Sequence, residues 1–452
     1  MPLKNRLPDA LTVAVAIFLW AVFYPGLMSN DSMFQYGEAL KGQYADWHPP
    51  LMAILLHGIL ALGGGLGALM LVQCLAGAFG VRALSRSVLA FFHGDRLPAG
   101  RAAWLSCLVL LALLVPLTPL AFYLMTFWKD AWAMVFLLWI ATFALDLYRA
   151  GPSPGRLVAI VVLAAALGLV RHNAVVVLPL LGVAVWAATR RRLGGPAAAL
   201  LGAAPLALYL VAGPLIAKGF KVQEYHPESQ IMALDLVGLC AADPAACPRR
   251  LPWTWSHVLD AEALARYRPG DVGFVYWDQP PHVDPSIGAD YPRLREEYLA
   301  AIRARPVAFA RVKVKAFATL LGRHQTEYFV HDSIVDNPYG LALGSTLEPV
   351  RRTLAVAVDG VGWNRRLRWV SGVHLVWIVA NLAWVAGLLA AWRRSRQERY
   401  GFLALLLLVP LAYYASYLAA TPGHDFRYMY PATLLVQTLT VSWLLGKLPA
   451  RT

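Results

Sequence analysis

The chain has 452 residues, of which 59% are hydrophobic and 15% charged, and its formal net charge is +14. Its apolar runs are longer than the helices of a soluble core require. This excludes a soluble globular protein and indicates a chain that crosses a bilayer several times. The basic residues gather at alternate ends of the apolar runs, so membrane topology explains the positive charge, and no nucleic acid is expected as a partner.

About ten apolar segments offer roughly enough helix to cross the hydrocarbon. In chain order they are Leu11–Met28, Leu66–Leu84, Ala102–Pro119, Ala131–Tyr148, Leu157–Val170, Ala174–Thr189, Ala197–Ala217, Val370–Trp392, Gly401–Ala419 and Tyr428–Gly446. The length of the first segment favours a retained anchor over a cleaved signal peptide. The predicted fold class is therefore an all-α polytopic membrane protein.

Arginine and lysine mark one side of the predicted membrane, because cytoplasmic loops keep basic residues. Together these ends account for nearly all of the net charge of +14. The alternation predicts that both termini are cytoplasmic. The residues on that side are Lys4, Arg6, Arg82, Arg86, Arg96, Arg101, Arg149, Arg156, Arg190, Arg191, Arg192, Arg393, Arg394, Arg396, Arg399, Lys447 and Arg451.

One long hydrophilic stretch, residues 218–369, falls outside the cytoplasm between the seventh and eighth spans. It has Pro-rich loops and candidate helices at Ala261–Arg268 and Tyr291–Arg305, and Pro306–Leu321 is expected to lie on the membrane surface. We expect a mixed outer domain here, between transmembrane modules 1–217 and 370–452. The shorter run Pro49–Leu62 is expected to form a helix against the outer face.

Two of the four cysteines lie in the outer domain. Cys240 and Cys247 flank a short Asp-Pro turn, which favours a local disulfide outside the cytoplasm, with two free thiols as the alternative. Cys74 and Cys107 lie within spans. Neither pair has the second Cys or His pair that a zinc site needs.

The short outer loops carry acidic residues, cations or both at the membrane boundary, where such residues are costly unless they pair or function. Because loops far apart in the sequence agree, we expect them to form one site. The candidate residues are Asp31, His48, Lys129, Asp130, Arg171, His172, Asp425, Arg427 and Tyr428.

Several of these residues also have a simpler interpretation. Asp31 suits the N-cap of a helix that begins near Ser32. Lys129 and Asp130 suit a boundary ion pair with the lysine reaching the headgroups, and Arg171 suits a solvated hairpin tip.

The remaining candidates have simpler interpretations too. His48 can terminate a loop before two prolines, and His172 can hydrogen-bond a neighbouring carbonyl. Asp425 and Arg427 can pair with each other, so that the last loop closes on itself without touching a substrate. Interfacial aromatic belts also explain nearby rings such as Tyr428.

The functional interpretation of the cluster is sugar transfer from a lipid phosphate. Three cations, Lys129, Arg171 and Arg427, suit a phosphate leaving group. Asp31 suits the base that takes the proton of an acceptor hydroxyl, and Asp130 a second acid. No catalytic metal is required, although Asp31, Asp130 and His48 can in principle gather a divalent cation.

A nucleotide-sugar donor is disfavoured, because the chain has no Asp-x-Asp motif and no cytoplasmic domain to house one. His48, His172, Asp425 and Tyr428 are the candidate substrate-binding residues around the proposed base and cations. The donor is therefore expected to be borne by a polyprenyl lipid.

These motifs resemble bacterial members of the GT-C superfamily of membrane glycosyltransferases. The resemblance is carried by Asp31, by Trp-His-Pro-Pro-Leu at 47–51, by Trp-Lys-Asp at 128–130, by Arg-His-Asn at 171–173 and by Asp-Phe-Arg-Tyr at 425–428. It covers the membrane part and not the outer domain.

The resemblance implies an essential first-loop aspartate, Asp31, and a second acidic residue, Asp130. It also implies a GT-C-like fold in the bacterial inner membrane and a polyprenyl-phosphate sugar as donor. The acceptor is expected to be an envelope lipid, lipopolysaccharide, polysaccharide or protein. Asp31 is followed by Ser32 and not by a second acid, which favours transfer of a monosaccharide over metal-dependent transfer of an oligosaccharide.

Other functions remain open on sequence alone. A ligase that moves a whole glycan would need a larger cleft in the outer domain. A transporter or flippase of a lipid-linked sugar would need polar residues along a path through the bilayer, whereas the ionisable residues stay at one face. A non-catalytic envelope assembly protein is the remaining alternative.

Overall fold

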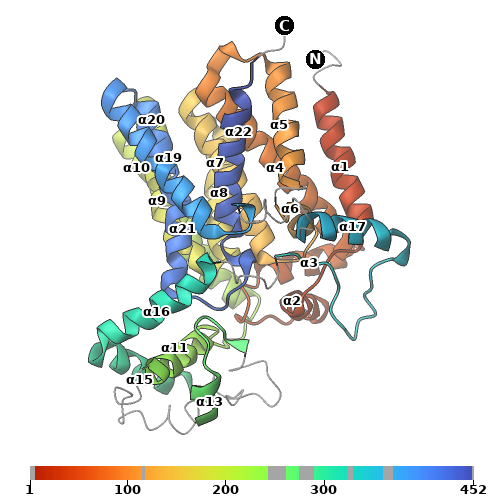
Figure 1. Cartoon of the computed structure of the whole chain (residues 1–452), viewed down its shortest axis with the longest axis vertical. Coiled ribbons are helices and arrows are strands. Elements are labelled where there is room, and N and C mark those ends of the chain that lie inside the picture. Colours follow the sequence, from red (N-terminus) through yellow and green to blue (C-terminus); the bar gives the residue numbers. More distant parts are fainter. Residues whose placement is uncertain are drawn as a thin grey trace.

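The computed structural model of the chain describes residues 6–114, 118–242, 261–273, 290–322, 329–359 and 370–449. Over these residues the secondary structure is helical, and extended chain pairs only through isolated bridges. Long helices form a bundle, and shorter helices gather at one end of it (Figure 1). The predicted all-α class is confirmed for the described residues.

Six helical stretches in the described part of the chain are long and apolar enough to cross a membrane. This fits a protein that passes through a membrane several times. The stretches are α4 (Leu66–His93), α7 (Lys129–Ala150), η3 (His172–Val177) with α9 (Leu178–Leu193), α10 (Gly195–Gly219), α19 (His374–Ser395), and α20 (Glu398–Leu406) with α21 (Leu408–Ala419).

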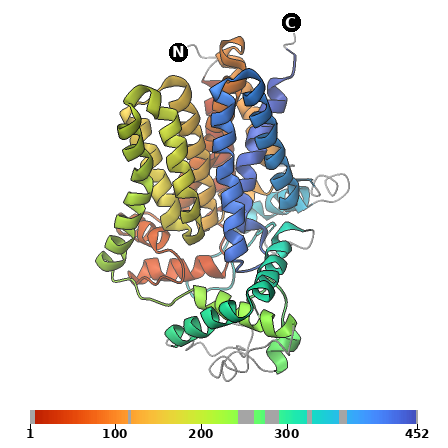
Figure 2. The same ribbon diagram turned by 90° about the vertical axis from the view of Figure 1, so that its left-hand side faces the viewer.

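Shorter helices complete the bundle. They are α1 (Leu7–Phe23), α5 (Ala99–Leu114), α8 (Pro154–Val170) and α22 (Tyr430–Gly446), and η2 (Gly94–Arg96) lies between α4 and α5. Figures 1 and 2 show that α1 begins and α22 ends at the same end of the bundle. We call the opposite end the outer end.

Short helices cover the outer end. They are α2 (Asn30–Lys41), α3 (Leu51–Ala61), α6 (Leu120–Leu124), η5 (Ser345–Leu347), α17 (Glu348–Asp359) and η6 (Phe426–Tyr428). Beyond them lies a small group of helices, the outer domain, made of α11 (Glu228–Ala242), α13 (Ala261–Arg266), α15 (Tyr291–Ala304) and α16 (Pro306–Leu321) (Figure 2).

Two predicted spans end earlier than expected. The first, Leu11–Met28, stops as helix α1 at Phe23, because Pro25 cannot continue the helix and the chain beyond it is extended. The third, Ala102–Pro119, corresponds to α5, which is described up to Leu114, and Thr118 and Pro119 are not helical and lead into the short helix α6. The extended backbone that follows α1, at Leu27 and Met28, is part of the site described below.

The outer domain has its own apolar core, formed by α11, α13, α15 and α16. Lys313 Nζ lies 2.5 Å from Asp235 Oδ2, which also accepts a hydrogen bond from the Tyr298 hydroxyl at 2.9 Å. The start of α16 packs in this core through Val312, whereas Leu320 near its end is buried in the core of the bundle. Helix α16 therefore joins the two cores.

The predicted outer disulfide lies partly outside the described residues. Cys240 is buried in α11 and is disulfide-bonded, whereas its predicted partner Cys247 is not among the described residues. Cys74 and Cys107 are free and buried in the bundle, as their positions within apolar helices predict.

Arg82, assigned from the sequence to a cytoplasmic helix end, is buried inside the bundle. Its Nη1 atom lies 2.9 Å from Asp9 Oδ1 and donates to Thr12 Oγ1 at 2.7 Å, while its Nε donates to Ser106 Oγ at 3.4 Å. One guanidinium thus joins α1, α4 and α5. A buried charged donor is costly to leave unpaired, which explains why three partners surround it.

We expect Arg82→Met to lower the free energy of unfolding by about 1–3 kcal/mol, because the buried hydroxyl groups of Thr12 and Ser106 and the exposed carboxylate of Asp9 lose their donor. Arg86→Met, an exposed arginine one turn later on α4, is the matched control. Thermal unfolding of the two purified variants in the same detergent measures the effect. Equal melting temperatures for the two variants would contradict the structural role of Arg82.

Candidate functional site

A short ladder of extended backbone places the first outer loop. Leu27 N donates to Met125 O at 2.7 Å and Phe127 N donates to Leu27 O at 3.0 Å. On the other side Met28 pairs with residues 333–335, since Met28 N donates to Ser333 O at 3.1 Å. The start of α2 is therefore held between the loop before α7 and segment 329–335.

Helix α2 begins directly after this ladder, with Ser29 as its N-cap. Ser29 Oγ accepts a hydrogen bond from Trp128 Nε1 at 2.8 Å, and Ser32 Oγ donates to Phe127 O at 2.8 Å. The interpretation of Asp31 as the cap is therefore wrong, because a serine already fills that position. The Asp31 carboxylate in the first turn is free for another partner.

That partner comes from the last outer loop. Arg427 Nη2 lies 2.7 Å from Asp31 Oδ2, and this pair joins residues 396 positions apart in the sequence. The Asp31 side chain is 27% exposed and the Arg427 side chain 5%. Burial raises the pKa of the Asp31 carboxyl, but the surrounding cations, Arg427 foremost, outweigh burial and hold it well below its usual range.

His48 and Lys129 lie on the other side of Asp31. Lys129 Nζ is 2.9 Å from His48 Nδ1, and because an ammonium group only donates, Nδ1 accepts and Nε2 carries the proton. His48 Nε2 is 3.8 Å from Asp31 Oδ1. Burial, with Lys129 next, lowers the pKa of His48 to about 3, so the ring is neutral near pH 7.

Asp130 and Arg171 form a second, more enclosed pair. Arg171 Nη2 lies 2.7 Å from Asp130 Oδ1, and the two side chains are 7% and 1% exposed. Arg171 also donates to the Tyr417 hydroxyl at 2.6 Å and lies 5.0 Å from the centre of the Tyr428 ring. Two simpler interpretations are thus wrong: Arg171 is not a solvated hairpin tip, and Asp130 pairs with Arg171 instead of Lys129.

Aromatic rings enclose the second guanidinium as well. The Arg427 guanidinium carbon lies 4.8 Å from the centre of the Trp128 ring and 5.1 Å from that of Tyr428. Its Nε atom is 3.2 Å from Asp425 Oδ2. The expected pair between Asp425 and Arg427 therefore exists, but it does not close the loop on itself, because Arg427 also reaches Asp31.

Buried packing behind η6 fixes this loop. Phe426 stacks on His374 with ring centres 4.2 Å apart, and His374 Nε2 lies 2.9 Å from Phe426 O. Phe329 packs on the other side of Phe426 at 4.9 Å. Sequence reasoning missed both His374 and Phe329, since each is a single residue in an apolar or uncharacterised stretch.

Asp31 and Arg427 line a cavity of about 550 Å³, which we call the reaction cavity. Its walls come from the first and last outer loops and from the outer domain, whose contribution the sequence did not predict. The lining residues are Asn30, Asp31, Phe34, Trp47, His48, Asp271, Val272, Gly273, Pro422, Gly423, His424, Asp425, Arg427 and Tyr428.

A second cavity of about 380 Å³ lies on the other side of segment 46–50, and we call it the apolar cavity. Trp47 and His48 line the reaction cavity, whereas Asp46, Pro49 and Pro50 line the apolar one. Its other lining residues come from α3, α8, α10 and the adjoining loops. They are Leu51, Gly168, Leu169, His172, Tyr209, Leu210, Gly213, Pro214, Ile216, Ala217 and Val222.

The predicted residue His172 lies at the apolar cavity and not at the reaction cavity. Its ring hydrogen-bonds the backbone of Asp46, which agrees with the simpler interpretation of this histidine. It is also close enough to Lys129 for their charges to interact. Lys129 lines neither cavity, but it contacts His48 of the reaction cavity and its charge acts on His172 of the apolar cavity.

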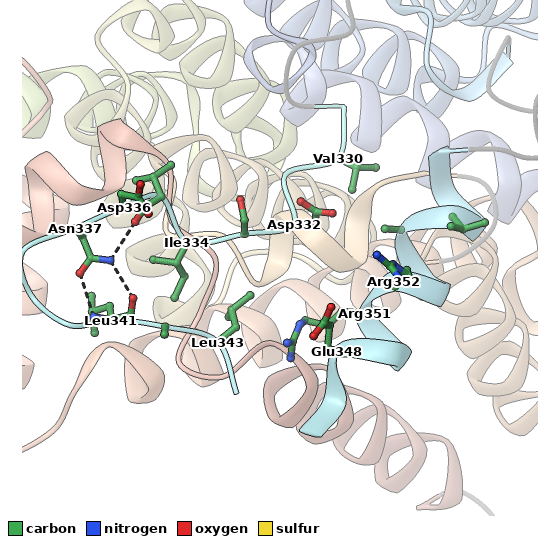
Figure 3. A pocket seen from close by; sticks show the side chains of 15 residues that line it. Val330, Asp332, Ile334, Asp336, Asn337, Leu341, Leu343, Glu348, Arg351 and Arg352 are labelled. Carbon is green, nitrogen blue, oxygen red and sulfur yellow. Dashed lines mark hydrogen bonds between the residues drawn. The ribbon is translucent and has the colours of Figure 1, made fainter. Parts of the chain in front are cut away.

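The largest of these three cavities, about 850 Å³, lies between residues 330–343 and α17 (Figure 3). Asn337 and Arg351 hold its walls, since Asn337 Nδ2 donates to Leu341 O at 2.9 Å and Arg351 Nη1 donates to Val22 O at 2.9 Å. In segment 329–335, Asp332 lines this cavity, whereas the neighbouring His331 packs on Trp128. The cavity is thus separated from the charged cluster.

A divalent cation was left open by the sequence. Among the described residues no group of three or more His, Cys, Asp or Glu side chains is arranged to hold a metal ion. Asp31 and Asp130 each turn to a different arginine.

Comparisons of the chain with protein-family models, curated proteins and solved structures give no match. The fold and the site therefore define the class by themselves. The chain is a helical protein whose apolar helices fit several membrane passages, with a cluster of paired charges at one end of its bundle.

The loop that carries His48 depends on a buried carboxyl group on α2. Glu38 Oε1 accepts a hydrogen bond from Ala45 N at 2.6 Å, and Glu38 is buried. Burial raises the pKa of Glu38 to about 7, although the Ala45 N–H opposes this. Because the folded pKa lies above the unfolded one, the protonated group stabilises the fold at low pH, and this stability is lost as pH rises toward 7.

We therefore expect Glu38→Gln to remove part of the pH dependence of stability. The variant should match the wild type at pH 5 and exceed it at pH 8, by on the order of 1–3 kcal/mol. Melting temperatures between pH 5 and 8 measure this, and Glu348→Gln, on an exposed carboxyl of α17, is the control. A wild type with the same pH dependence as Glu38→Gln would contradict the assignment.

Proposed function

We propose that this protein is a membrane glycosyltransferase that moves a sugar from a polyprenyl-phosphate carrier to an envelope acceptor. The observation that carries the proposal is the junction of two unlike cavities. The apolar cavity and the charged reaction cavity share segment 46–50 as their common wall, and Lys129 contacts His48 of this wall. In a polyprenyl-phosphate sugar the apolar tail, the phosphate and the sugar follow one another in the same order as the apolar cavity, Lys129 and the reaction cavity.

The donor fits this junction from one end to the other. Its polyprenyl tail occupies the apolar cavity beside α8 and α10, where Tyr209 and Leu210 line the wall. Its phosphate lies at Lys129, and its sugar lies in the reaction cavity. Helix α10 supports this placement, because its surface is almost entirely exposed and apolar, as a helix that faces lipid would be.

Asp31 acts as the base in this reaction. It takes the proton of an acceptor hydroxyl as that oxygen bonds to the sugar and the bond between the sugar and the phosphate breaks. The phosphate leaves with the electron pair of that bond, and fixed cations stabilise its charge. Lys129 and Arg427 are the cations nearest to Asp31, whereas Arg171 is enclosed with Asp130 and orients the loops.

At rest Arg427 makes Asp31 a weak base, because it holds the pKa of the carboxyl well below its usual range. The donor phosphate competes with Asp31 for the same guanidinium. Once the phosphate engages Arg427, Asp31 loses its strongest cationic partner and regains basicity. The donor is therefore expected to bind before the acceptor reacts.

We further infer that ten helices cross the bacterial inner membrane, with the outer end at the periplasm and both termini in the cytoplasm. The six long stretches are joined in the bundle by α1, α5, α8 and α22, which run alongside them (Figures 1 and 2). Arginines such as Arg190 and Arg393 collect at the opposite end, as expected for a cytoplasmic face.

Mass spectrometry of envelope glycans tests the proposal in cells that carry the wild type, a deletion or Asp31→Asn. We expect the deletion and Asp31→Asn to lose the same sugar, with transfer by Asp31→Asn reduced at least about a hundredfold. Asp332→Asn, which changes a carboxylate of the largest cavity, is the matched control and should keep the sugar. Full transfer by Asp31→Asn would overturn the proposal that Asp31 is the base.

The competition for Arg427 predicts that Asp31→Asn, which should lose transfer, should gain affinity for a lipid phosphate. Asp31→Asn should bind undecaprenyl phosphate severalfold to about tenfold more tightly than the wild type, because Arg427 no longer has a carboxylate partner. Arg427→Gln should bind it more weakly. Titration of the purified full-length proteins in detergent measures both affinities, with undecaprenol as the control that lacks phosphate.

The binding measurements test the lipid-phosphate donor and the competition for Arg427 separately. Saturable binding that requires the phosphate supports a lipid-phosphate donor, and its absence in the wild type argues against one. Unchanged affinity in Asp31→Asn would contradict the competition while leaving the donor class in place.

A further inference from the structure

The outer domain contributes one acidic side chain to the reaction cavity. Asp271 lines the same cavity as Asp31, and Val272 and Gly273 lie beside it. Asp271 Oδ1 accepts a hydrogen bond from Gly273 N at 2.8 Å, whereas no residue in the described part of the chain holds Oδ2. A carboxylate in a cavity wall with one oxygen unused is poised to accept hydrogen bonds from a ligand.

Close packing fixes the position of this carboxylate. Gly270, directly before Asp271, has φ of +74°, and a Cβ atom there would lie 2.6 Å from Thr319 Oγ1 and 3.2 Å from Ala316 O of α16. Only glycine fits such a position without strain. Val272 packs against the core of the outer domain. The segment is therefore anchored to α16, the helix that joins the outer domain to the bundle.

Asp271 is not suited to bind the donor phosphate, because two negatively charged groups repel each other. Lys129 and the apolar cavity lie on the side of segment 46–50 that faces α10, whereas Asp271 lines only the reaction cavity. A cavity of about 550 Å³ is within the range that holds a drug-sized ligand, which leaves room for a second ring beside the donor sugar.

The remaining walls show what kind of second ligand fits. The aromatic residues Phe34 and Trp47 line the cavity together with the polar residues Asp271 and Asn30, whereas the Tyr428 ring already packs against two guanidinium groups. Aromatic faces combined with a carboxylate suit a polyhydroxylated ring, which packs its C–H face on a ring and donates its hydroxyl groups to the carboxylate. We propose that Asp271 binds the acceptor and that the acceptor is a saccharide.

This inference rests on the proposed function, because it assigns the second substrate of the same site. Asp271 acts as an acceptor-binding residue that holds one hydroxyl of the acceptor sugar while another hydroxyl of that ring faces Asp31. In this role Asp271 accepts no proton from the reacting hydroxyl and forms no covalent bond during the transfer. Asp271 is thus a specificity residue and Asp31 alone is the base.

The test uses full-length Asp271→Asn and Asp271→Ser, which keep an acceptor atom for Gly273 N–H and so preserve the turn. Asp332→Asn is the matched control, and Asp31→Asn reports on the proposed function itself. Two quantities are measured for each variant: the amount of the transferred sugar in the envelope, by mass spectrometry, and the affinity of the purified protein for undecaprenyl phosphate.

We expect both Asp271 variants to lose transfer by about tenfold to a hundredfold while their affinity for undecaprenyl phosphate stays within about twofold of the wild type. Retained affinity also shows that the variants are folded. Normal transfer in both Asp271 variants, with transfer lost in Asp31→Asn, overturns this inference and leaves the proposed function standing. Normal transfer in Asp31→Asn overturns the proposed function.

Linkage analysis of the product tests the class of acceptor. Fragmentation of the wild-type glycan should show the transferred sugar bonded to a hydroxyl of another sugar. A transferred sugar bonded directly to a protein side chain or to a lipid phosphate overturns the assignment of a saccharide acceptor.

Discussion

The organisation of the outer end depends on the need to pair charges that are largely removed from water. Arg427 and Arg171 are both buried, and a buried guanidinium without a partner would cost several kcal/mol. Each arginine is met by a carboxylate at 2.7 Å, Asp31 for one and Asp130 for the other. Because the partners come from different loops, pairing the charges also decides where these loops meet.

The charges of the cluster balance, and this balance limits what can enter. Three carboxylates, Asp31, Asp130 and Asp425, face three cations, Lys129, Arg171 and Arg427, and His48 is neutral near pH 7. The cation nearest to Asp31, Arg427, is held by that carboxylate, whereas Lys129 contacts the neutral ring of His48. In the proposed reaction, a phosphate that also engages Arg427 takes this cation from Asp31, so binding of the proposed donor and release of the proposed base are coupled.

The sequence predicts which residues gather but not how they pair. Polar residues at membrane boundaries are informative because the bilayer penalises them, and Asp31, His48, Lys129 and Arg427 do lie together. The pairing escapes prediction because neighbours in the sequence such as Lys129 and Asp130 compete with distant partners. His48 takes Lys129, and Arg171 takes Asp130.

Other parts of the site have no sequence signal at all. From the sequence, Ser29 and Asp31 are equally good candidates for the N-cap of α2. The structure shows that Ser29 is the cap and that its hydroxyl accepts a hydrogen bond from Trp128. Asp271 is one acid among many in a hydrophilic segment, and only the packing of Gly270 on α16 brings it to the reaction cavity. Helical periodicity did predict α15 and α16 closely, because each has a regular apolar face and a proline at its start.

The two cavities border different surroundings, so the two sides of the site are chemically distinct. The apolar cavity borders α10, whose exposed surface is apolar, whereas the reaction cavity borders the outer domain and its polar loops. A lipid-borne donor and a water-borne acceptor would therefore approach from opposite sides of segment 46–50 and meet at Asp31. His48 lies in that wall, contacts Lys129 and directs its Nε2 atom toward Asp31, the proposed base, at 3.8 Å. In the proposed reaction, this wall keeps the polyprenyl tail of the donor apart from the hydroxyl groups of the acceptor. The acceptor reacts only after Asp31 has been released from Arg427.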